Sequence, residues 1–354
     1  MNNLIRQSVQ ALDGYVPGEQ PQGSDVVKLN TNENPWLCSA EVHDILREID
    51  VASLAKYPDP VCTEVRKVIA QKHSVGVGNV FAGNGSDEVL ALCIRAFVER
   101  NGGSVGYFDP SYSLYSVLAQ IEDVETRPVA LDESFGWQMA EDYEASVFFL
   151  TNPNAPTSLL FPKEKIEEFI CSFPGVVVID EAYVDFASEN CMDFATEYKN
   201  VLVCRTLSKS YALAGIRFGY CVGNKDLIDA LYKIKDSYNV NMLTQELARV
   251  ALLDQGSMEA ITAAVKNSRK LMTEELQMLG FNVLPSETNF LWTKPPKPGA
   301  KSIFEELKKH NVFVRWFDGD RTRDYLRITV GTDAQTMLLV EALEEILGKG
   351  KTDG

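Results

Sequence analysis

The sequence is poor in the residues that build metal centres and catalytic triads. It has three histidines, at positions 43, 73 and 310, and none has a second histidine or a cysteine at ligand spacing. Zinc sites and histidine-based triads depend on such residues. The seven cysteines form no CxxC pair and lie mostly in apolar surroundings, a pattern typical of free buried thiols in a reducing compartment. We therefore expect no metal ion.

Basic charge and long apolar runs are also scarce. Lysine and arginine number 34 against 50 acidic residues, which gives a formal net charge of −16. Nucleic-acid and anionic membrane surfaces require an excess of basic residues. No apolar run approaches the roughly 20 residues that cross a bilayer, and the N-terminus shows no signal-peptide pattern. We expect a cytoplasmic protein that binds neither nucleic acid nor membranes, so an anionic substrate would need a locally basic pocket.

The middle of the chain alternates short runs rich in β-branched and aromatic residues with amphipathic helical windows. Such alternation is typical of an α/β protein with a largely parallel sheet. The runs are 104–108, 146–150, 176–179, 201–204 and 217–222. From about residue 245 a long helical region continues to residue 279, followed by shorter strand-like runs at 289–292, 312–315 and 325–330. This change predicts a smaller α+β domain at the C-terminal end.

Polar residues follow the predicted strands of the large domain. Asp180 and Tyr183 come after the run 176–179, Lys209 comes after the run 201–204, and the small-residue turn 83–88 opens a helix. In parallel sheets, ligands bind beyond the carboxyl ends of the strands. Pyridoxal 5′-phosphate needs an amine for a Schiff base, a carboxylate beside its pyridine nitrogen, and donors for its phosphate. These residues would supply all three.

Each of these residues also has an ordinary structural interpretation. A lone lysine after a strand is usually a surface residue. Asp180 could cap a helix or turn, and Tyr112 could be a core aromatic. The order of motifs along the chain favours the functional interpretation.

Eleven short motifs occur in one order along nearly the whole chain. They are GYVPG (14–18), LNTNENP (29–35), KYPD (56–59), GNGSDE (83–88), PSY (110–112), NPNAPT (152–157), DEAY (180–183), TLSKS (206–210), AGIR (214–217), SETN (286–289) and LRITVG (326–331). With these motifs the sequence resembles the fold-type I pyridoxal-phosphate aminotransferases, and within them the histidinol-phosphate aminotransferases. The resemblance implies an N-terminal segment (1–44) that joins the small domain and the substrate site, a large cofactor-binding domain (45–250) with a mainly parallel mixed sheet between helices, and a small α+β domain (251–354).

The resemblance also implies roles around the cofactor. Lys209 would bond covalently to it and then move a proton as a free amine, which is covalent catalysis followed by acid–base catalysis. Asp180 would pair with the pyridine nitrogen and Tyr183 would contact the phenolic oxygen. Tyr112 would stack on the ring, with Asn154 nearby. The phosphate would be held by Gly85, Ser86, Asp87, Thr206, Ser208 and Arg217, with Tyr57 of a partner subunit in a homodimer.

On the substrate side, the resemblance directs Arg327 at an acidic group, with Arg315, Tyr15 and Asn32 as further contacts. The implied reaction transfers the amino group of L-histidinol phosphate to 2-oxoglutarate, giving imidazole acetol phosphate and L-glutamate in histidine biosynthesis. The alternatives are another aminotransferase of this fold, for aromatic amino acids, a phosphothreonine decarboxylase-like enzyme, and a binding module without catalysis.

The chain departs from its relatives at one motif. Most relatives have Asn-Pro-Thr-Gly, in which the asparagine donates to the phenolic oxygen, whereas this chain has Ala155-Pro-Thr-Ser158. Either Asn154 takes over that role or Tyr183 acts with less help. The serine in place of glycine also bears on the geometry of the turn.

Overall fold

A seven-stranded mixed sheet forms the centre of the larger part of the molecule. The computed structural model describes residues 4–23 and 25–348, so the outermost residues of the two predicted terminal regions lie outside the described residues. The strand order is β2-β8-β7-β6-β5-β3-β4, with β8 antiparallel to both of its neighbours. The strands are β2 (Val80–Gly83), β3 (Ser104–Asp109), β4 (Glu125–Ala130), β5 (Val147–Thr151), β6 (Val176–Asp180), β7 (Val201–Thr206) and β8 (Gly219–Gly223). The predicted α/β class with a mainly parallel mixed sheet is confirmed.

Helices cover both faces of this sheet because alternate strand residues point to opposite sides. Val147 and Phe149 of β5 pack toward one helical layer, and Phe148 and Leu150 pack toward the other. The first layer contains α4 (Ser86–Phe97), α5 (Leu114–Glu122) and α8 (Lys225–Ile234), and the second contains α3 (Thr63–Lys72), α6 (Lys163–Ser172), α7 (Phe194–Glu197) and α9 (Met242–Leu253). Burial on both faces explains why the central strands are continuous apolar runs.

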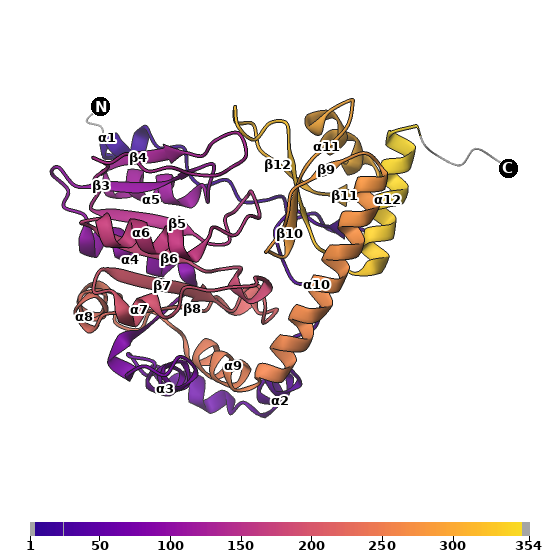
Figure 1. Ribbon diagram of the computed structural model, residues 1–354. Coiled ribbons are helices and arrows are strands. Elements are labelled where there is room, and N and C mark those ends of the chain that lie inside the picture. Colours follow the sequence, from indigo (N-terminus) through magenta and orange to yellow (C-terminus); the bar gives the residue numbers. More distant parts are fainter. Residues whose placement is uncertain (1–3, 24, 349–354) are drawn as a thin grey trace.

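A smaller part of the molecule lies beside the carboxyl ends of the sheet strands (Figure 1). Its antiparallel sheet has the order β12-β13-β10-β9, and β1 of the N-terminal segment pairs with β11. The strands are β1 (Val27–Lys28), β9 (Asn282–Val283), β10 (Phe290–Lys294), β11 (Val312–Phe313), β12 (Arg315–Trp316) and β13 (Leu326–Thr329). The remaining helices are α1 (Gln7–Gln10), α2 (Ala40–Glu48), α10 (Gln255–Met278), α11 (Ala300–Lys309) and α12 (Asp333–Ile346).

The helical region predicted between residues 245 and 279 is two helices, α9 and α10, which meet at Asp254. The Asp254 side chain accepts a hydrogen bond from the backbone N–H of Ser257 and so caps α10. Helix α10 then runs from the base of the large part to the small part (Figure 1). Across the described ranges, we find no helix that is both long and apolar enough to span a membrane.

Candidate active site

The predicted site residues gather at the carboxyl edge of the seven-stranded sheet. Asp180 is the last residue of β6, Thr206 is the last residue of β7, and Lys209 follows three residues later. These strands are adjacent and parallel, so their ends lie side by side. The topology therefore brings together groups that the sequence separates.

Asp180 is a buried carboxylate with hydrogen-bond donors but no cation. The Tyr115 hydroxyl donates to Oδ2 at 2.7 Å, and the Ala182 N–H donates to Oδ1 at 3.2 Å. Among the described residues, no lysine, arginine or histidine forms an ion pair with Asp180. Burial raises the pKa of Asp180 to about 6, although the bond from Tyr115 lowers it. A cation bound at this carboxylate would relieve the cost of its burial.

Tyr115 is a site residue that the motif analysis missed. It lies in the first turn of α5, is fully buried, and also bonds Thr151 Oγ1 at 2.6 Å. Its ring meets that of Tyr112 edge-on, with centroids 5.6 Å apart. The one available signal was its position three residues after Tyr112, since that spacing places two side chains on the same side of a helical turn.

The Lys209 amine lies close to the N-terminal segment and to Tyr183. Its Nζ donates to the backbone carbonyl of Asn32 at 3.2 Å and lies 5.7 Å from the Tyr183 ring centroid. Burial, together with the positive charge of Arg327, lowers the pKa of Lys209 to about 8. About a tenth of this amine is therefore uncharged at pH 7, far more than for an exposed lysine.

The N-terminus of α4 supplies free backbone amides beside an arginine. Its N-cap is Gly85, with a φ of 83° and no side-chain cap. A Cβ at Gly85 would come within 2.8 Å of the Arg217 guanidinium, so the glycine makes room for the arginine. Uncapped amides at a helix N-terminus attract anions, and the guanidinium fork matches phosphate oxygens.

Further hydroxyls lie at the same place. Thr206 is the register partner of Gly219, whose backbone packs against the N–H of Ser86. The Thr206 hydroxyl donates to Ser208 Oγ at 2.9 Å. Arg217 also forms an ion pair with Asp87 at 3.2 Å. The structure therefore places the six predicted phosphate contacts of this chain in one region: Gly85, Ser86, Asp87, Thr206, Ser208 and Arg217.

Two tyrosines border this region. The Tyr112 hydroxyl donates to Asp87 Oδ1 at 3.3 Å, and its ring meets that of Tyr15 edge-on at 6.2 Å between centroids. Tyr15 belongs to the N-terminal segment and is about 42% exposed. The two rings extend the site from the large part toward that segment.

Arg315 and Arg327 form a basic corner on the small sheet. Arg327 donates to the carbonyl of Asn30 at 3.0 Å, and Arg315 donates to the carbonyls of Val16 and Pro17. Across the described residues, neither guanidinium is within ion-pair distance of a carboxylate, and the buried Nε of Arg327 has no hydrogen-bond partner. Burial lowers the pKa of Arg327. This corner can accept an anion.

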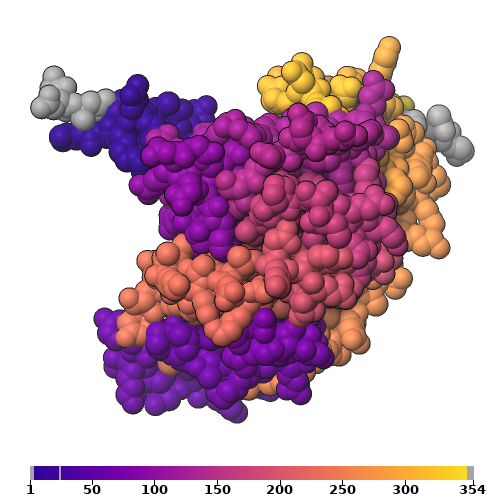
Figure 2. Space-filling model, turned by 60° about the vertical axis from the view of Figure 1, so that its left-hand side comes forward, coloured from indigo at the N-terminus to yellow at the C-terminus, as the bar shows by residue number. Residues whose placement is uncertain are grey.

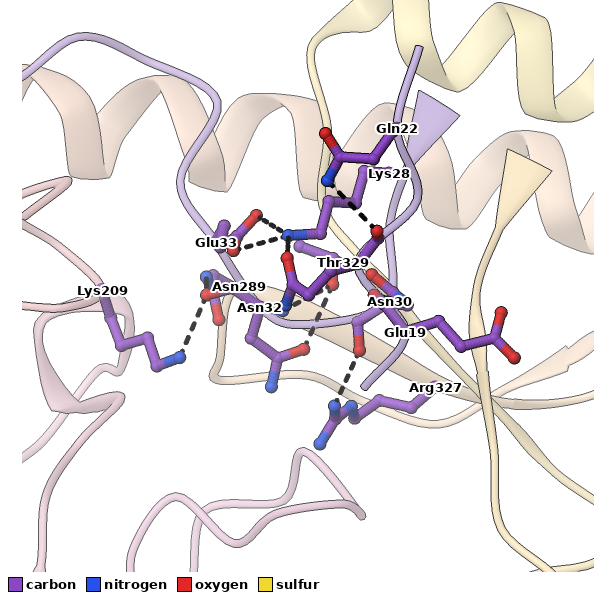
Figure 3. Close-up of polar contacts among 11 residues, drawn as sticks. Glu19, Gln22, Lys28, Asn30, Asn32, Glu33, Lys209, Asn289, Arg327 and Thr329 are labelled. Atoms are coloured by element: carbon purple, nitrogen blue, oxygen red, sulfur yellow. Dashed lines mark hydrogen bonds and ion pairs between the residues drawn. The ribbon is translucent and has the colours of Figure 1, made fainter. Parts of the chain in front are cut away.

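The segment between β1 and α2 crosses the site between Lys209 and Arg327 (Figure 3). Its carbonyls at Asn30 and Asn32 accept from Arg327 and Lys209 respectively. The Lys28–Glu33 ion pair, at 2.7 Å, links the end of β1 to this segment. The Asn34 side chain donates to the Lys209 carbonyl at 2.8 Å, a contact that the motif analysis did not anticipate.

The loop that carries the departure from the family pattern has a defined geometry. The Asn154 amide donates to Pro110 O at 3.2 Å and to Thr157 Oγ1 at 2.9 Å, and its oxygen accepts from Ser111. Ser158 takes the left-handed conformation, with a φ of 64°, and its hydroxyl donates to the Pro285 carbonyl at 3.0 Å. The side chain of Asn154 is thus engaged by its own loop and by the turn that follows β3.

Tyr57 stacks on another exposed tyrosine and not on a predicted site residue. It is about 81% exposed, and its ring stacks on Tyr238 with centroids 4.5 Å apart.

These groups fit pyridoxal 5′-phosphate on observations of the structure itself. Asp180 is a buried carboxylate that lacks a cation among the described residues, and a protonated ring nitrogen would provide one. The uncapped start of α4 with Arg217 matches a phosphate. Lys209 is an amine with a lowered pKa at the same strand edge. No group of three or more metal-binding side chains occurs within residues 4–23 and 25–348.

Comparison with known proteins agrees with this site. Residues 24–343 match the family of class I and II aminotransferases. The chain is therefore a pyridoxal-phosphate-dependent aminotransferase. The chain is 42% identical over 350 residues to histidinol-phosphate aminotransferase 1 of Trichormus variabilis, covering 98% of this chain and 100% of that relative. It belongs to the family of histidinol-phosphate aminotransferases.

Solved structures show the same fold. The histidinol-phosphate aminotransferase of Sinorhizobium meliloti in complex with pyridoxal-5′-phosphate matches with a TM-score of 0.87 at 23% identity, covering 99% of both chains. The L-threonine-O-3-phosphate decarboxylase of Porphyromonas gingivalis matches with a TM-score of 0.79 at 25% identity, covering 91% of this chain and 100% of that chain. The fold is shared by enzymes that catalyse different reactions, so the substrate has to be argued from the site.

Proposed function

We propose that this protein transfers the amino group of L-histidinol phosphate to 2-oxoglutarate, giving imidazole acetol phosphate and L-glutamate in histidine biosynthesis. The relative from Trichormus variabilis that it matches over almost the whole chain carries the name of this activity. The observation that carries the proposal is the basic corner of Arg315 and Arg327. Two guanidinium groups without carboxylate partners among the described residues suit a phosphate or a carboxylate.

The negative net charge of the chain makes a locally basic corner significant for the binding of an anionic substrate. At a net charge of −16, the protein as a whole repels anions. Histidinol phosphate has no carboxylate, so its phosphate is the group that Arg327 and Arg315 would bind. In the second half-reaction the carboxylates of 2-oxoglutarate would occupy the same corner. Tyr15 closes the N-terminal side of this space and would add a polar contact.

Lys209 would perform the proton transfers. Pyridoxal phosphate, when bound, supplies an electrophilic aldehyde and a ring that withdraws electrons from the carbon that bears the amine. The Lys209 amine, with its pKa lowered to about 8, can accept a proton from that carbon and return it elsewhere. The Asn32 carbonyl holds the free amine at 3.2 Å.

Asp180 and Tyr183 would hold the cofactor ring. Asp180 would keep the ring nitrogen protonated, because the pair of opposite charges relieves the desolvation of the carboxylate. Tyr115 orients that carboxylate through its 2.7 Å bond. The Tyr183 hydroxyl would face the phenolic oxygen, and the start of α4 with Thr206, Ser208 and Arg217 would bind the phosphate.

We further propose a homodimer located in the cytoplasm. Tyr57, exposed on this chain, would reach the phosphate site of the second subunit. The N-terminal residues from Leu4 onward, indigo in Figure 2, stand away from the body of the molecule, and apolar side chains are exposed there and near Tyr57. These include Leu4, Val16, Leu37, Val51 and Leu54. A second subunit would cover such residues.

Turnover with matched amino donors tests the substrate. Purified protein should convert L-histidinol phosphate with 2-oxoglutarate and form equimolar glutamate. L-histidinol, which lacks the phosphate, should be a poorer donor by about 100-fold in kcat/KM or more, since it cannot form charge-assisted bonds to the arginines. Equal use of the two donors would contradict the role of the basic corner.

Two further substrates separate the alternatives. L-phenylalanine as the best donor would favour an aromatic aminotransferase. Release of carbon dioxide from L-threonine phosphate would favour the decarboxylase. Full cofactor binding without turnover of any donor would favour a binding module.

A further inference from the structure

Asn32 forms hydrogen bonds with four protein groups in and around the active site. Its carboxamide nitrogen donates to the Tyr183 hydroxyl at 2.9 Å. Its backbone carbonyl accepts from Lys209 at 3.2 Å and from Asn289 at 3.0 Å. Its backbone N–H donates to Thr329 Oγ1 at 2.9 Å. Because Asn32 is buried, its polar atoms bond to these protein groups and not to solvent.

The backbone at Asn32 is in the left-handed region, with a φ of 54°. Asparagine tolerates this conformation better than most residues that have a side chain. In this conformation the Asn32 carbonyl contacts Lys209 while its side chain contacts Tyr183. A residue with a branched side chain would strain the same position.

Thr329 determines which way the Asn32 carboxamide points. The Thr329 hydroxyl accepts from the Asn32 N–H and donates to Asn32 Oδ1 at 3.2 Å. With the oxygen so engaged, the NH₂ group is left to face Tyr183. Figure 3 shows this contact with Thr329 on one side of Asn32 and Lys209 on the other.

The loop 152–158 leaves no side-chain amide for Tyr183. Ala155 packs in the same small apolar cluster as Tyr183 but has no amide. The amide of Asn154 donates to Pro110 and Thr157. Among the described residues, the side-chain amide that binds the Tyr183 hydroxyl is that of Asn32.

We propose that Asn32 is a positioning residue whose amide fixes the Tyr183 hydroxyl. Because Asn32 donates to that hydroxyl, the proton of Tyr183 is directed away from Asn32 and into the site. No acceptor for this proton lies within hydrogen-bond distance among the described residues. The inference rests on the proposed contact of Tyr183 with the cofactor, and it gives Asn32 a role different from binding substrate.

The test compares Asn32→Gly with Tyr183→Phe, the double variant, and Asn311→Gly as the control. Glycine adopts a positive φ without strain and keeps the carbonyl that holds Lys209, so only the carboxamide is lost. Asn311 has a similar φ of 58°, and its side chain bonds Asp25 outside the site. Thermal unfolding of Asn32→Gly and Asn311→Gly, without cofactor, measures any general effect on stability.

The first readout needs no substrate. It is the pH midpoint at which the visible absorption of the bound cofactor changes. Asn32→Gly should move this midpoint by about one pH unit, the size expected for one hydrogen bond, while Asn311→Gly leaves it in place. In the Tyr183→Phe background the same substitution should have little effect, because Asn32 acts through that hydroxyl.

The second readout separates positioning from substrate binding. Asn32→Gly should lower kcat about tenfold and leave KM within about threefold. An unchanged midpoint, an equal shift in the Tyr183→Phe background, or a rise in KM alone would overturn the proposal. Asn32→Asp keeps the shape of the side chain and replaces the donor by an acceptor, so it should also move the midpoint. This variant replaces Asn32→Gly in the test if Asn32→Gly binds the cofactor poorly. A wrong substrate assignment would leave the midpoint result intact, so the two proposals fail separately.

Discussion

Arg315 and Arg327 lie directly opposite each other on the paired strands β12 and β13. Like charges in this arrangement destabilise a sheet. Here both guanidinium groups bond main-chain carbonyls instead of carboxylates. The pair therefore concentrates positive charge beside Tyr15. A bound anionic substrate would offset the repulsion between the two guanidinium groups.

Replacing Arg327 by glutamine should cost most of the substrate recognition. We expect kcat/KM for L-histidinol phosphate to fall about 100-fold, because a pair of charge-assisted bonds to the phosphate is lost. Arg323→Gln serves as the control, since Arg323 is an exposed arginine that pairs with Asp320. Steady-state kinetics with both variants measures the effect. A decrease of similar size in Arg323→Gln would show that general charge, and not this corner, governs recognition.

Asp180→Asn should stabilise the cofactor-free protein at neutral pH. Burial raises the pKa of Asp180 from 3.8 to about 6, so the folded state binds more protons than the unfolded state between these values. Stability of the cofactor-free protein therefore falls as pH rises through that window, by on the order of 3 kcal/mol from this residue. Urea denaturation should therefore show a higher free energy of unfolding for Asp180→Asn than for the parent protein at pH 7, and no difference between them at pH 4. The same variant should lose activity.

Glu181, the next residue, should respond in the opposite way. Its buried carboxylate pairs with Arg205 at 2.8 Å. Glu181→Gln leaves Arg205 without its ionic partner, and we expect a loss of about 3–5 kcal/mol in the free energy of unfolding. Urea denaturation of the cofactor-free protein measures this loss. If Glu181→Gln is as stable as the parent protein, the ion pair contributes little to the fold.

Tyr115→Phe tests a residue that no motif indicated. The substitution removes the donor to Asp180 Oδ2, so the pKa of Asp180 should rise further. Cofactor affinity should fall by about 3- to 10-fold, the value of one hydrogen bond. Equilibrium titration of the cofactor-free protein with pyridoxal phosphate, followed by absorbance, gives the affinity. Tyr143→Phe, whose hydroxyl bonds Arg127 O outside the site, should retain the parent value.

The alternation of apolar runs was enough to predict the sheet that positions this site. It placed β3, β5, β6, β7 and β8 within a residue or two, because strands buried on both faces are continuous apolar runs. It missed the two edge strands, β2 and β4. Strand β2 is buried but only four residues long, and β4 is largely exposed, so its sequence shows no buried face. The break between α9 and α10 was also missed, since Asp254 interrupts an otherwise helical pattern by a single capping residue.

The site was predictable where a motif places several chemical groups within a few residues. Lys209, with Thr206 and Ser208 beside it, is such a case. Contacts between distant segments were not predictable, because they depend on how the chain crosses the site. Asn32 and Tyr183 are separated by 151 positions, and Asn32 and Thr329 by 297. The left-handed backbone at Asn32 had no signal beyond the residue type itself.

Absorbance of the purified protein, first with L-histidinol phosphate and then with 2-oxoglutarate, shows directly whether both half-reactions take place. We expect the band of the bound cofactor to change to that of the aminated cofactor with the first reagent and to return with the second. Lys209→Ala should show neither change. A band that L-histidinol phosphate leaves unaltered, while an aromatic amino acid shifts it, would contradict the proposed substrate and leave the aminotransferase fold in place.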